Sequence, residues 1–289
     1  MSLDAVHAGV VVTGTGAVRD TCDPTPFVRQ RKLRKFMGRQ DDLAVAAAGR
    51  ALQSAALAAP LGERCGLYMA VGYIPFEASD MDGLLEASLD GDRFSMARFA
   101  ANAFSAINPL LTFRVLPNMP AFHVSLNFDI QGPYAVSYPG PGQFYAVLED
   151  AFAALESNAI DVALVGAVAD QRNVLVEHHF GRIEPPVDPS RLANGAGFLV
   201  IERANDASAR GAVIHARLTD YRLTYTPGDP FAGGTPFECL AVDGACVGGG
   251  RQFGPASLAV AIAGTARGRL THRLRSRDGF DADSAWEVS

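Results

Sequence analysis

The stretch 131–156 constrains the fold of this chain more than any other, because it reads as a strand, a tight turn and a helix in direct succession. The strand is expected over 134–138, which is short, apolar and aromatic. The helix is expected from Gln143 onward, where apolar residues recur with a helical period. These residues are Phe144, Val147, Leu148, Ala151, Phe152 and Leu155. A sharp strand-to-helix turn exposes one side chain and directs helix N–H groups toward a developing oxyanion, as in several enzyme families.

The turn itself contains no side chain that can act as a nucleophile. It reads Pro139-Gly140-Pro141-Gly142, without serine, cysteine or threonine. Pro139 and Pro141 also lack backbone N–H groups, which makes the helix start a poorer oxyanion site than most. The sequence therefore predicts the framework of a catalytic site from which the reactive group is missing.

Composition places the chain among globular α/β proteins. It has 289 residues, 48% of them apolar and 19% charged, with 29 glycines, which is enough for one large domain or two ordinary ones. The net charge of −6 gives no reason to expect nucleic acid as a partner. No apolar run is long enough to span a bilayer, and the start lacks the features of a signal peptide. We therefore expect a cytoplasmic protein.

The four cysteines are scattered, with no C-x-x-C pair and no histidine cluster beside them. They are Cys22, Cys65, Cys239 and Cys246. This spacing favours reduced thiols and gives no zinc site. We expect neither a metal nor a cofactor.

Further strands and helices are expected along the chain. Buried parallel strands are predicted at 10–13, 65–71, 161–168 and 194–203, and the first runs into a turn at Gly14-Thr15-Gly16. That turn has part of a dinucleotide-binding fingerprint, but Arg19 replaces its third glycine, which favours a packing turn. The remaining predictions are a helix at 41–57, a helical or irregular insertion at 83–104, a strand at 212–221, a loop at 226–250, a helix at 255–267 and a hairpin at 269–288 turned at Arg277-Asp278-Gly279.

Isolated polar residues give further candidates for a site. The basic run 29–39 either meets an acidic partner such as an acyl carrier protein or is a solvated face. His123 is either a base or, given its apolar segment, a satisfied core residue. His178 and His179, as neighbours on a strand, would point in opposite directions and share no metal. Gly248-Gly249-Gly250-Arg251 is either an anion site or a flexible joint.

Several segments resemble β-ketoacyl synthases of the thiolase-like superfamily, in the same order along residues 10–221. The segment 10–16 resembles the opening strand of those enzymes, and 33–37 with the following Ala-rich helix resembles their first long helix. The segment 116–133 resembles the approach to their nucleophile, and 161–167 and 194–212 resemble the next two strands. The resemblance implies an α/β thiolase-like fold with a complete N-terminal half, 1–221, and a strongly contracted C-terminal half, 222–289.

The departures from this family concern its reactive residues. On the family's motif the nucleophilic cysteine falls at Gly140, which has no side chain to acylate. Arg251 stands where one family histidine is expected, and little sequence is left between Tyr225 and Gly250 for the loop that bears the other. Because such groups act as a unit, their joint loss implies that the chain has no independent catalytic activity.

The resemblance therefore points to a chain length factor, an inactive ketosynthase-like subunit, of the short form that occurs in aryl polyene pathways. Such a subunit pairs with an active ketosynthase in polyketide or fatty-acid-like biosynthesis and forms part of its acyl tunnel, with acyl carrier protein as an indirect partner. The edge strand expected at the dimer interface consists of Tyr134, Ala135, Val136, Ser137 and Tyr138. Candidates for the tunnel wall are Phe104, Phe113, Phe122 and Phe128, for which an ordinary core role is equally open.

Two other classes of function stay open at this point. One is an acyl hydrolase or acyltransferase with a relocated nucleophile, Ser137 or Cys246. The other is a self-paired homodimer that binds acyl chains. An acyl adduct on the isolated protein would indicate the first class, and a stable homodimer with bound lipid would indicate the second.

Overall fold

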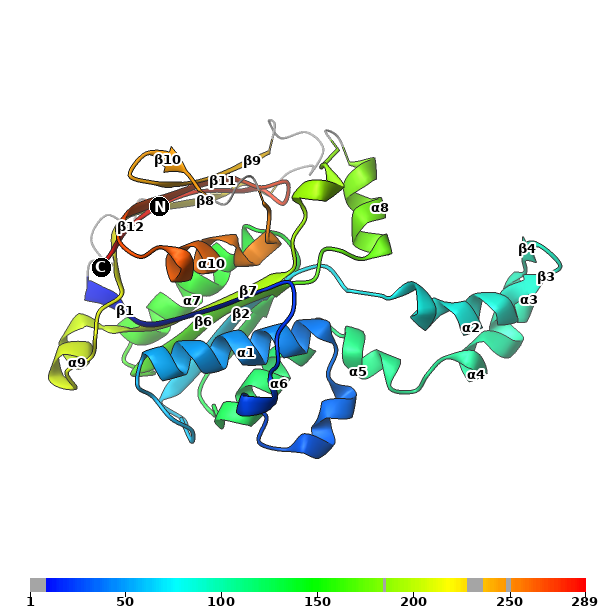
Figure 1. The fold of residues 1–289 in the computed structure, drawn as a ribbon, viewed down its shortest axis with the longest axis horizontal. Helices are drawn as coiled ribbons and strands as arrows, with labels where there is room; N and C mark the ends of the chain where they lie inside the picture. Colours follow the sequence, from blue (N-terminus) through cyan, green and yellow to red (C-terminus); the bar gives the residue numbers. More distant parts are fainter. Residues whose placement is uncertain (1–8, 184–185, 228–235, 248–250) are drawn as a thin grey trace.

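The computed structural model describes residues 9–183, 186–227, 236–247 and 251–289, and it has the mixed α/β architecture that the sequence predicts (Figure 1). The strands of its main sheet are β1 (Val10–Arg19), β2 (Cys65–Val71), β5 (Tyr134–Ser137), β6 (Val162–Ala169), β7 (Gly195–Arg203), β8 (Ala216–Tyr225), β9 (Phe237–Val242), β10 (Ala245–Cys246), β11 (Gly268–Arg275) and β12 (Phe280–Val288). A separate pair consists of β3 (Leu89–Asp90) and β4 (Arg93–Phe94). The helices are α1 (Arg39–Ser54), α2 (Ala78–Ser88), α3 (Met96–Arg98), α4 (Phe104–Ala106), α5 (Leu111–Val115), α6 (Met119–Phe128), α7 (Gln143–Glu156), α8 (Val174–Arg182), α9 (Ala204–Ala209) and α10 (Ser257–Gly264).

The 10-stranded main sheet is folded back on itself into two stacked layers. Its strand order is β10-β9-β11-β12-β8-β1-β7-β6-β2-β5, and β8 and β1 are joined, within the described residues, by the pairs Val11–Arg217 and Val12–Ala216 alone. The sheet turns at this short join, so that an upper layer of β8, β12, β11 and β9 lies over a lower layer of β1, β7, β6 and β2 (Figure 1). Helices α7 and α10 lie between the layers, and α1 and α6 cover the far face of the lower layer.

Each face of the lower layer has its own hydrophobic core. Between the layers, Phe144 and Phe152 of α7 pack in one cluster with Trp286 of β12, and all of them are almost fully buried. On the other face, Leu43 of α1 and Val124 of α6 pack against the same strands. A strand covered on both faces needs apolar residues at successive positions, which explains the unbroken apolar runs of β2, β6 and β7.

The predicted turn at Gly14-Thr15-Gly16 is wrong, because β1 continues through it as one strand to Arg19. The glycines serve helix packing, since a Cβ on Gly16 would lie 2.2 Å from the carbonyl oxygen of Ala47 in α1. The predicted parallel direction is also wrong for β1 and β7, which pair antiparallel with each other, while β2 pairs parallel with β5 and β6. An apolar run that is buried on both faces does not reveal the direction of its neighbours.

Several other predicted elements are confirmed. The strand, turn and helix of 131–156 are β5, the turn and α7, the helix at 41–57 is α1, and the hairpin at 269–288 is β11–β12. The strand expected at 212–221 begins later, as β8. The helix expected at 255–267 is a 3₁₀ turn over Gly254–Ala256 followed by α10.

The predicted loop at 226–250 is wrong for part of its length. Residues 237–242 and 245–246 form the β9–β10 hairpin, whereas 228–235 and 248–250 lie outside the described residues. Asp243 and Gly244 adopt positive φ in a two-residue turn. An Asp-Gly pair is the sequence signal for such a turn. β9 also pairs with β11, a contact between distant segments that the glycine content did not reveal.

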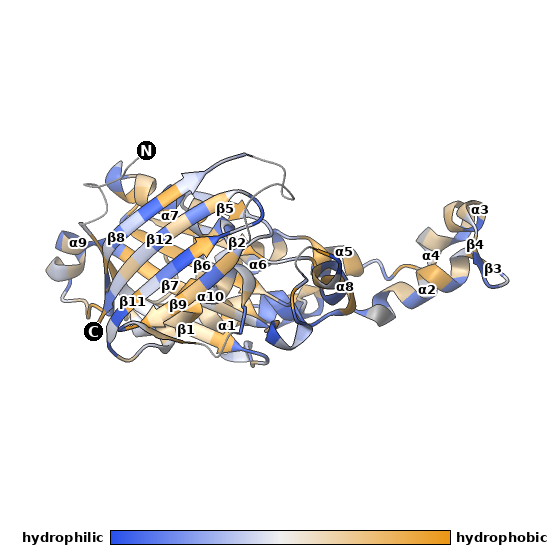
Figure 2. Ribbon diagram, turned by 90° about the horizontal axis from the view of Figure 1, so that it is seen from above, coloured by the Kyte–Doolittle hydropathy of each residue, from blue (hydrophilic) through white to orange (hydrophobic). Residues whose placement is uncertain are grey.

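The insertion expected at 83–104 is confirmed as an arm of α2, β3, β4, α3 and α4 that projects from the body of the molecule (Figures 1 and 2). At the root of the arm, Arg114 Nη2 of α5 donates a hydrogen bond to Asp80 Oδ1 of α2, at 2.9 Å. Farther out, Leu85, Phe94 and Met96 are exposed. Among the described helices, none combines the length and the apolar character that a bilayer crossing requires.

Candidate functional site

The turn between β5 and α7 is the candidate functional site, and the tip of the β11–β12 hairpin closes over it. A Cβ on Gly140 would lie 2.7 Å from Asp278 Oδ2 at that tip. The same carboxylate oxygen accepts a hydrogen bond, at 2.8 Å, from Gln143 Nε2 in the first turn of α7. Beside it, a Cβ on Gly142 would lie 2.4 Å from the Phe280 ring. The space that a side chain at Gly140 needs is therefore occupied by a carboxylate.

An aromatic cluster borders this turn. The Tyr73 ring lies 6.2 Å from the Tyr138 ring and 5.6 Å from the Phe180 ring, measured between centroids. The Tyr73 hydroxyl lies 3.1 Å from His179 Nε2. Burial raises the pKa of Tyr73, and burial together with the charge of Arg277 lowers the pKa of His179. The pair is a neutral phenol hydrogen-bonded to a neutral imidazole, and it lacks the ionised oxygen that nucleophilic attack needs.

The two adjacent histidines lie on helix α8, so the prediction that they are strand neighbours is wrong. Consecutive helical residues are about 100° apart around the axis. His179 consequently faces Tyr73, while His178 Nε2 lies 3.5 Å from Arg182 Nη1. The sequence signal for this helix was Asn173, because asparagine is favoured at the N-cap position of a helix. Its side chain accepts a hydrogen bond from the N–H of Val176.

Of the remaining candidates from the sequence, Ser137 lies beside the turn as the last residue of β5, whereas Arg251 and Cys246 lie on other segments. Arg251 Nη1 lies 3.8 Å from the carboxylate of Asp20, which follows β1, and the glycines 248–250 before it lie outside the described residues. Ser137 lies on β5 and Cys246 lies on β10, at opposite ends of the strand order. The structure does not bring these two nucleophile candidates together.

The phenylalanines expected at the tunnel differ in their surroundings. Phe128, at the end of α6, is 7% exposed and packs against Phe27, with ring centroids 6.4 Å apart. Phe113 and Phe122 are 45% and 47% exposed. Phe104 belongs to α4, and its side chain lies outside the described part of the structure. Phe128 is therefore a core residue of this chain, whereas Phe113 and Phe122 present apolar surface.

His123 is a buried core residue of α6, as predicted, with 1% of its surface exposed. Its ring nitrogens have no hydrogen-bond partner among the described residues, so the expectation of a satisfied histidine is wrong. Its Nε2 lies 4.0 Å from Asp41 Oδ2 of α1, which is longer than a hydrogen bond. Burial lowers the pKa of His123 to about 4, so the imidazole is neutral at pH 7. The carboxylate beside it was not foreseen from the sequence, because Asp41 is brought there by the packing of α1 on α6.

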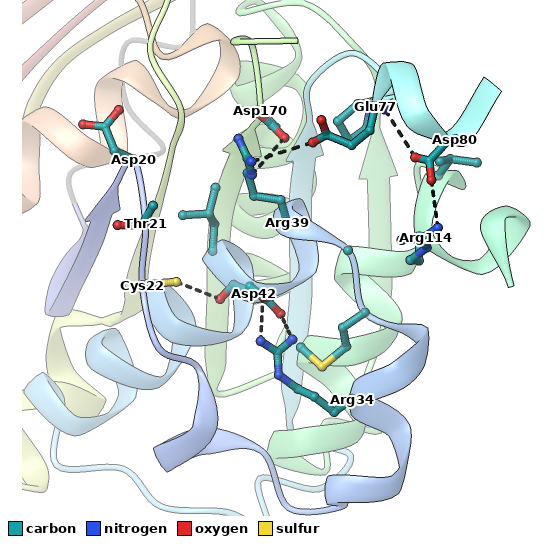
Figure 3. A pocket seen from close by; sticks show the side chains of 15 residues that line it. Asp20, Thr21, Cys22, Arg34, Arg39, Asp42, Glu77, Asp80, Arg114 and Asp170 are labelled. Atoms are coloured by element: carbon teal, nitrogen blue, oxygen red, sulfur yellow. Dashed lines mark hydrogen bonds and ion pairs between the residues drawn. The ribbon is translucent and has the colours of Figure 1, made fainter. Parts of the chain in front are cut away.

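A cavity of ≈ 510 Å³ lies at the root of the arm and is lined mainly by charged side chains (Figure 3). Arg34 Nη2 donates a hydrogen bond to Asp42 Oδ2, at 2.8 Å. Arg39 Nε lies 3.6 Å from Asp170 Oδ2 and Arg39 Nη2 lies 3.7 Å from Glu77 Oε1. Burial raises the pKa of Asp170 to about 6, with Arg39 opposing that shift. These ion pairs join α1 to the 3₁₀ turn before it, to the residue that follows β6 and to the start of the arm.

A buried polar network joins α7 to the upper layer, and sequence reasoning missed it. The Tyr145 hydroxyl lies 2.9 Å from His272 Nδ1 and 2.9 Å from Ser284 Oγ. His272 Nε2 lies 3.2 Å from Glu238 Oε1, and Trp286 Nε1 donates to Ser284 Oγ at 3.0 Å. With the proton of His272 on Nε2, every contact in this network has one donor and one acceptor. The Tyr145 hydroxyl then donates to His272 Nδ1, and the Ser284 hydroxyl donates to the Tyr145 oxygen. The network fixes α7, and the turn before it, against the strands whose hairpin tip covers that turn.

Replacing Tyr145 with phenylalanine is expected to lower the free energy of unfolding by about 2–3 kcal/mol, because the buried His272 Nδ1 and Ser284 Oγ lose a partner that water does not replace. Urea-induced unfolding measures the loss. Tyr134→Phe is the matched control, because Tyr134 is 76% exposed. Its hydroxyl is expected to contribute less than about 0.5 kcal/mol. Equal stability of the two variants would contradict the role given to the network.

Comparison with known proteins agrees with this architecture. The family model described as Beta-ketoacyl synthase, N-terminal domain, matches residues 2–207. Among solved structures, the chain is similar to a chain in the structure of AntDE:AntF. That structure is described as a type II polyketide synthase acyl-carrier protein in complex with its ketosynthase bound to the hexaketide. The identity is 15% and the TM-score 0.71, over 97% of this chain and 99% of that chain.

Two further solved structures match a smaller share of the chain. The ishigamide ketosynthase/chain length factor is 25% identical with a TM-score of 0.53, over 75% of this chain and 63% of that chain. A β-ketoacyl synthase from Burkholderia phymatum STM815 is 18% identical with a TM-score of 0.56, over 75% of this chain and 64% of that chain. The chain thus spans slightly less than two thirds of the length of these two proteins. Because the family model covers residues 2–207, which include every strand of the lower layer and the turn at Gly140, this chain belongs to the β-ketoacyl synthase family.

Proposed function

We propose that this chain is a catalytically inactive ketosynthase-like subunit, a chain length factor, that pairs with an active ketosynthase and shapes the acyl tunnel. The pathway class is polyketide or fatty-acid-like biosynthesis, with aryl polyene pigments as the specific proposal. Similarity to the ishigamide ketosynthase/chain length factor, at 25% identity, supports the pairing. The division into 1–221 and 222–289, a cytoplasmic location and the lack of a cofactor belong to the same proposal and rest on the sequence resemblance.

The filled turn at Gly140 is the observation that carries this proposal. A ketosynthase needs a side chain there that accepts the acyl group, and glycine offers none. The Asp278 carboxylate stands 2.7 Å from the position of the missing Cβ. A negative charge at this distance opposes both a thiolate nucleophile and an oxyanion, because like charges raise each other's free energy. The site is therefore unsuited to acyl transfer in two independent ways.

Restoring a cysteine alone is expected not to restore a reactive thiol. In Gly140→Cys the side chain meets Asp278, whose charge and bulk hold the thiol protonated and shielded. The double variant Gly140→Cys with Asp278→Ala removes that obstacle. Its thiol is expected to react with iodoacetamide at least about tenfold faster than that of the single variant. Peptide mapping by mass spectrometry identifies the alkylated residue.

Asp278→Ala alone is the control for this comparison, since it changes the hairpin tip without adding a thiol. Equal alkylation rates in the single and double variants would show that Asp278 does not block the turn. Rapid acylation of Gly140→Cys by an acyl carrier substrate would contradict the account of the filled site.

Strand β5 supplies the proposed pairing surface. It stands at one end of the strand order, so within the described chain its outer edge has no partner. The N–H of Leu67 donates to the carbonyl of Pro133, at 3.0 Å, and in a parallel ladder alternate residues make the bonds. Tyr134 and Val136 therefore direct their N–H and C=O groups away from β2. An exposed edge of this kind requires protection, and a partner strand provides it.

Exposed apolar side chains outside β5 support a large interface. Phe113 of α5 and Phe122 of α6 are exposed, and Leu85, Phe94 and Met96 are exposed on the arm. Exposed large apolar side chains that a partner can cover are typical of a protein–protein interface. We propose that the partner covers these side chains and that Phe113, Phe122 and Phe104 contribute to the tunnel wall.

Co-expression with a Cys-containing ketosynthase from the same gene neighbourhood tests the proposal. With an affinity tag on this chain alone, we expect the ketosynthase to copurify in equal amount and the pair to elute together in size-exclusion chromatography. The chain expressed alone is expected to self-associate, because its edge strand and arm stay uncovered. A well-behaved monomer that does not retain the ketosynthase would refute the proposal.

The basic run 29–39 is proposed as a contact for the acyl carrier protein. Arg34 and Arg39 are turned toward carboxylates of the cavity, as described above. By contrast, the charged side chains left exposed, without an ion pair among the described residues, are Arg29, Arg31, Lys32 and Lys35. On a chain with a net charge of −6, such a cluster attracts an acidic partner.

Reversing charge at Arg31 and Lys32, as Arg31→Glu with Lys32→Glu, is expected to weaken binding of acyl carrier protein by the assembled pair about tenfold at low salt. The effect is expected to shrink as ionic strength rises. Arg217→Glu with Arg269→Glu is the matched control, because these arginines are exposed on the upper layer and the charge change is the same. Equal weakening by both double variants, measured by fluorescence anisotropy, would favour the solvated-face interpretation.

A further inference from the structure

The β9–β10 hairpin carries two cysteines on the same face of the upper layer. Cys246 of β10 pairs with Ala241 of β9. Cys239 precedes Ala241 by two positions on the same strand, and residues two apart on a strand point to the same side. The two thiols are therefore diagonal neighbours across the hairpin.

The two thiols differ in exposure. Cys246 is exposed, whereas Cys239 is partly buried. Burial and a hydrogen bond with the Cys246 thiol raise the pKa of Cys239, and the charge of Arg273, opposite Cys239 on β11, acts against that shift. Cys246 is consequently the sulfur that a reagent in solution reaches first, and Cys239 lies within reach of it.

The other two cysteines have thiols of raised pKa, although Cys22 is partly exposed at the cavity. Cys22 donates a hydrogen bond from its thiol to the Asp42 carbonyl, and burial raises its pKa to about 11. Cys65 is buried in β2, and burial raises its pKa to about 12. Thiols with such raised pKa values contain little of the reactive thiolate at neutral pH.

We infer that Cys239 and Cys246 form a redox-active dithiol, which a low-molecular-weight disulfide oxidises to a disulfide bond across the hairpin. The Cys246 thiolate attacks one sulfur of the external disulfide, forming a mixed disulfide and releasing one thiol. The Cys239 thiolate then attacks the Cys246 sulfur, forming the intramolecular bond and releasing the second thiol. Two electrons and two protons pass from the protein thiols to the external disulfide.

The position of β10 permits this reaction. Diagonal neighbours on antiparallel strands have Cα atoms roughly 7–8 Å apart. A disulfide needs about 4.4–6.8 Å, so one strand must shift slightly. β10 is the terminal strand of the sheet order, and within the described residues it pairs with β9 alone, so its movement disturbs no other pairing. In a reducing compartment such a bond is transient and reports on the redox state.

Reaction with dithiobis(nitrobenzoate), an aromatic disulfide, tests the inference on the native protein. We expect two thionitrobenzoate anions to be released rapidly per chain, while intact mass falls by two hydrogen atoms and no adduct remains. Cys65 is expected to react only after unfolding, and Cys22 is expected to react more slowly than Cys246 because its pKa is raised. A stable adduct on the wild-type chain, or equal reactivity of all the cysteines, would overturn the inference.

Single variants locate the two steps. Cys239→Ser is expected to release one thionitrobenzoate and to keep the other half of the reagent bound at Cys246. Cys246→Ser is expected to react at least about tenfold more slowly, because the exposed first thiol is gone. Cys22→Ser, the control, is expected to behave like wild type. Loss of the adduct from Cys239→Ser would show that another cysteine resolves it, which contradicts the pairing. The result is independent of whether the chain pairs with a ketosynthase.

Discussion

Gly16→Val is expected to lower the free energy of unfolding by at least about 3 kcal/mol, because the new side chain has no space between β1 and α1. Even the first added atom, Cβ, would lie 2.2 Å from the Ala47 carbonyl oxygen and 2.4 Å from the Ala51 nitrogen. Both are backbone atoms of α1, so no rotation of a side chain relieves the contact. The helix must move off the lower layer, which opens the core that it shares with α6. Urea-induced unfolding followed by circular dichroism measures the loss.

Gly9→Val is the matched control for this substitution. Gly9 immediately precedes β1, and no atom lies within 4 Å of a Cβ placed on it. The control is expected to change stability by less than about 0.5 kcal/mol. If Gly16→Val is as stable as the control, then β1 and α1 are not packed as closely as described.

Val136→Pro is expected to weaken association with the ketosynthase on the order of 100-fold, because proline removes an outward N–H from the proposed pairing edge. The N–H of Val136 points away from β2, so the strand keeps its bonds within the chain. The dissociation constant of the purified pair, measured by analytical ultracentrifugation, reports the effect.

Val136→Thr is the control, since threonine keeps the N–H and the β-branched shape. Its affinity is expected to stay within about threefold of wild type, because the outward N–H of the pairing edge is kept. Thermal unfolding of the isolated variants separates a lost interface from a lost fold. Unchanged affinity in Val136→Pro, with the fold intact, would exclude β5 as the pairing edge.

The parts of the fold that the sequence predicts well are those with a local signal. The Pro-Gly turn between an aromatic strand and a helical period identified β5 and α7, and the Ala-rich segment identified α1. Asp278-Gly279 identified the turn of the last hairpin. Each of these signals depends on neighbours along the chain, so no knowledge of the tertiary structure was needed.

The contacts that define the site depend on segments far apart in the sequence. Nothing near Gly140 in the sequence indicates that Asp278 occupies the space beside it, or that Tyr73 and His179 border the turn. The network of Tyr145 likewise requires α7 to lie against β11 and β12. The absence of a nucleophile could therefore be predicted from the sequence, whereas the group that fills its place could not.

Native mass spectrometry of the co-expressed pair, after incubation with acylated carrier protein, tests the central claim most directly. We predict a complex with one copy of this chain for each copy of the ketosynthase, and an acyl group on the ketosynthase alone. An acyl adduct on this chain, or a chain that stays unpaired while the ketosynthase is acylated, would contradict the account.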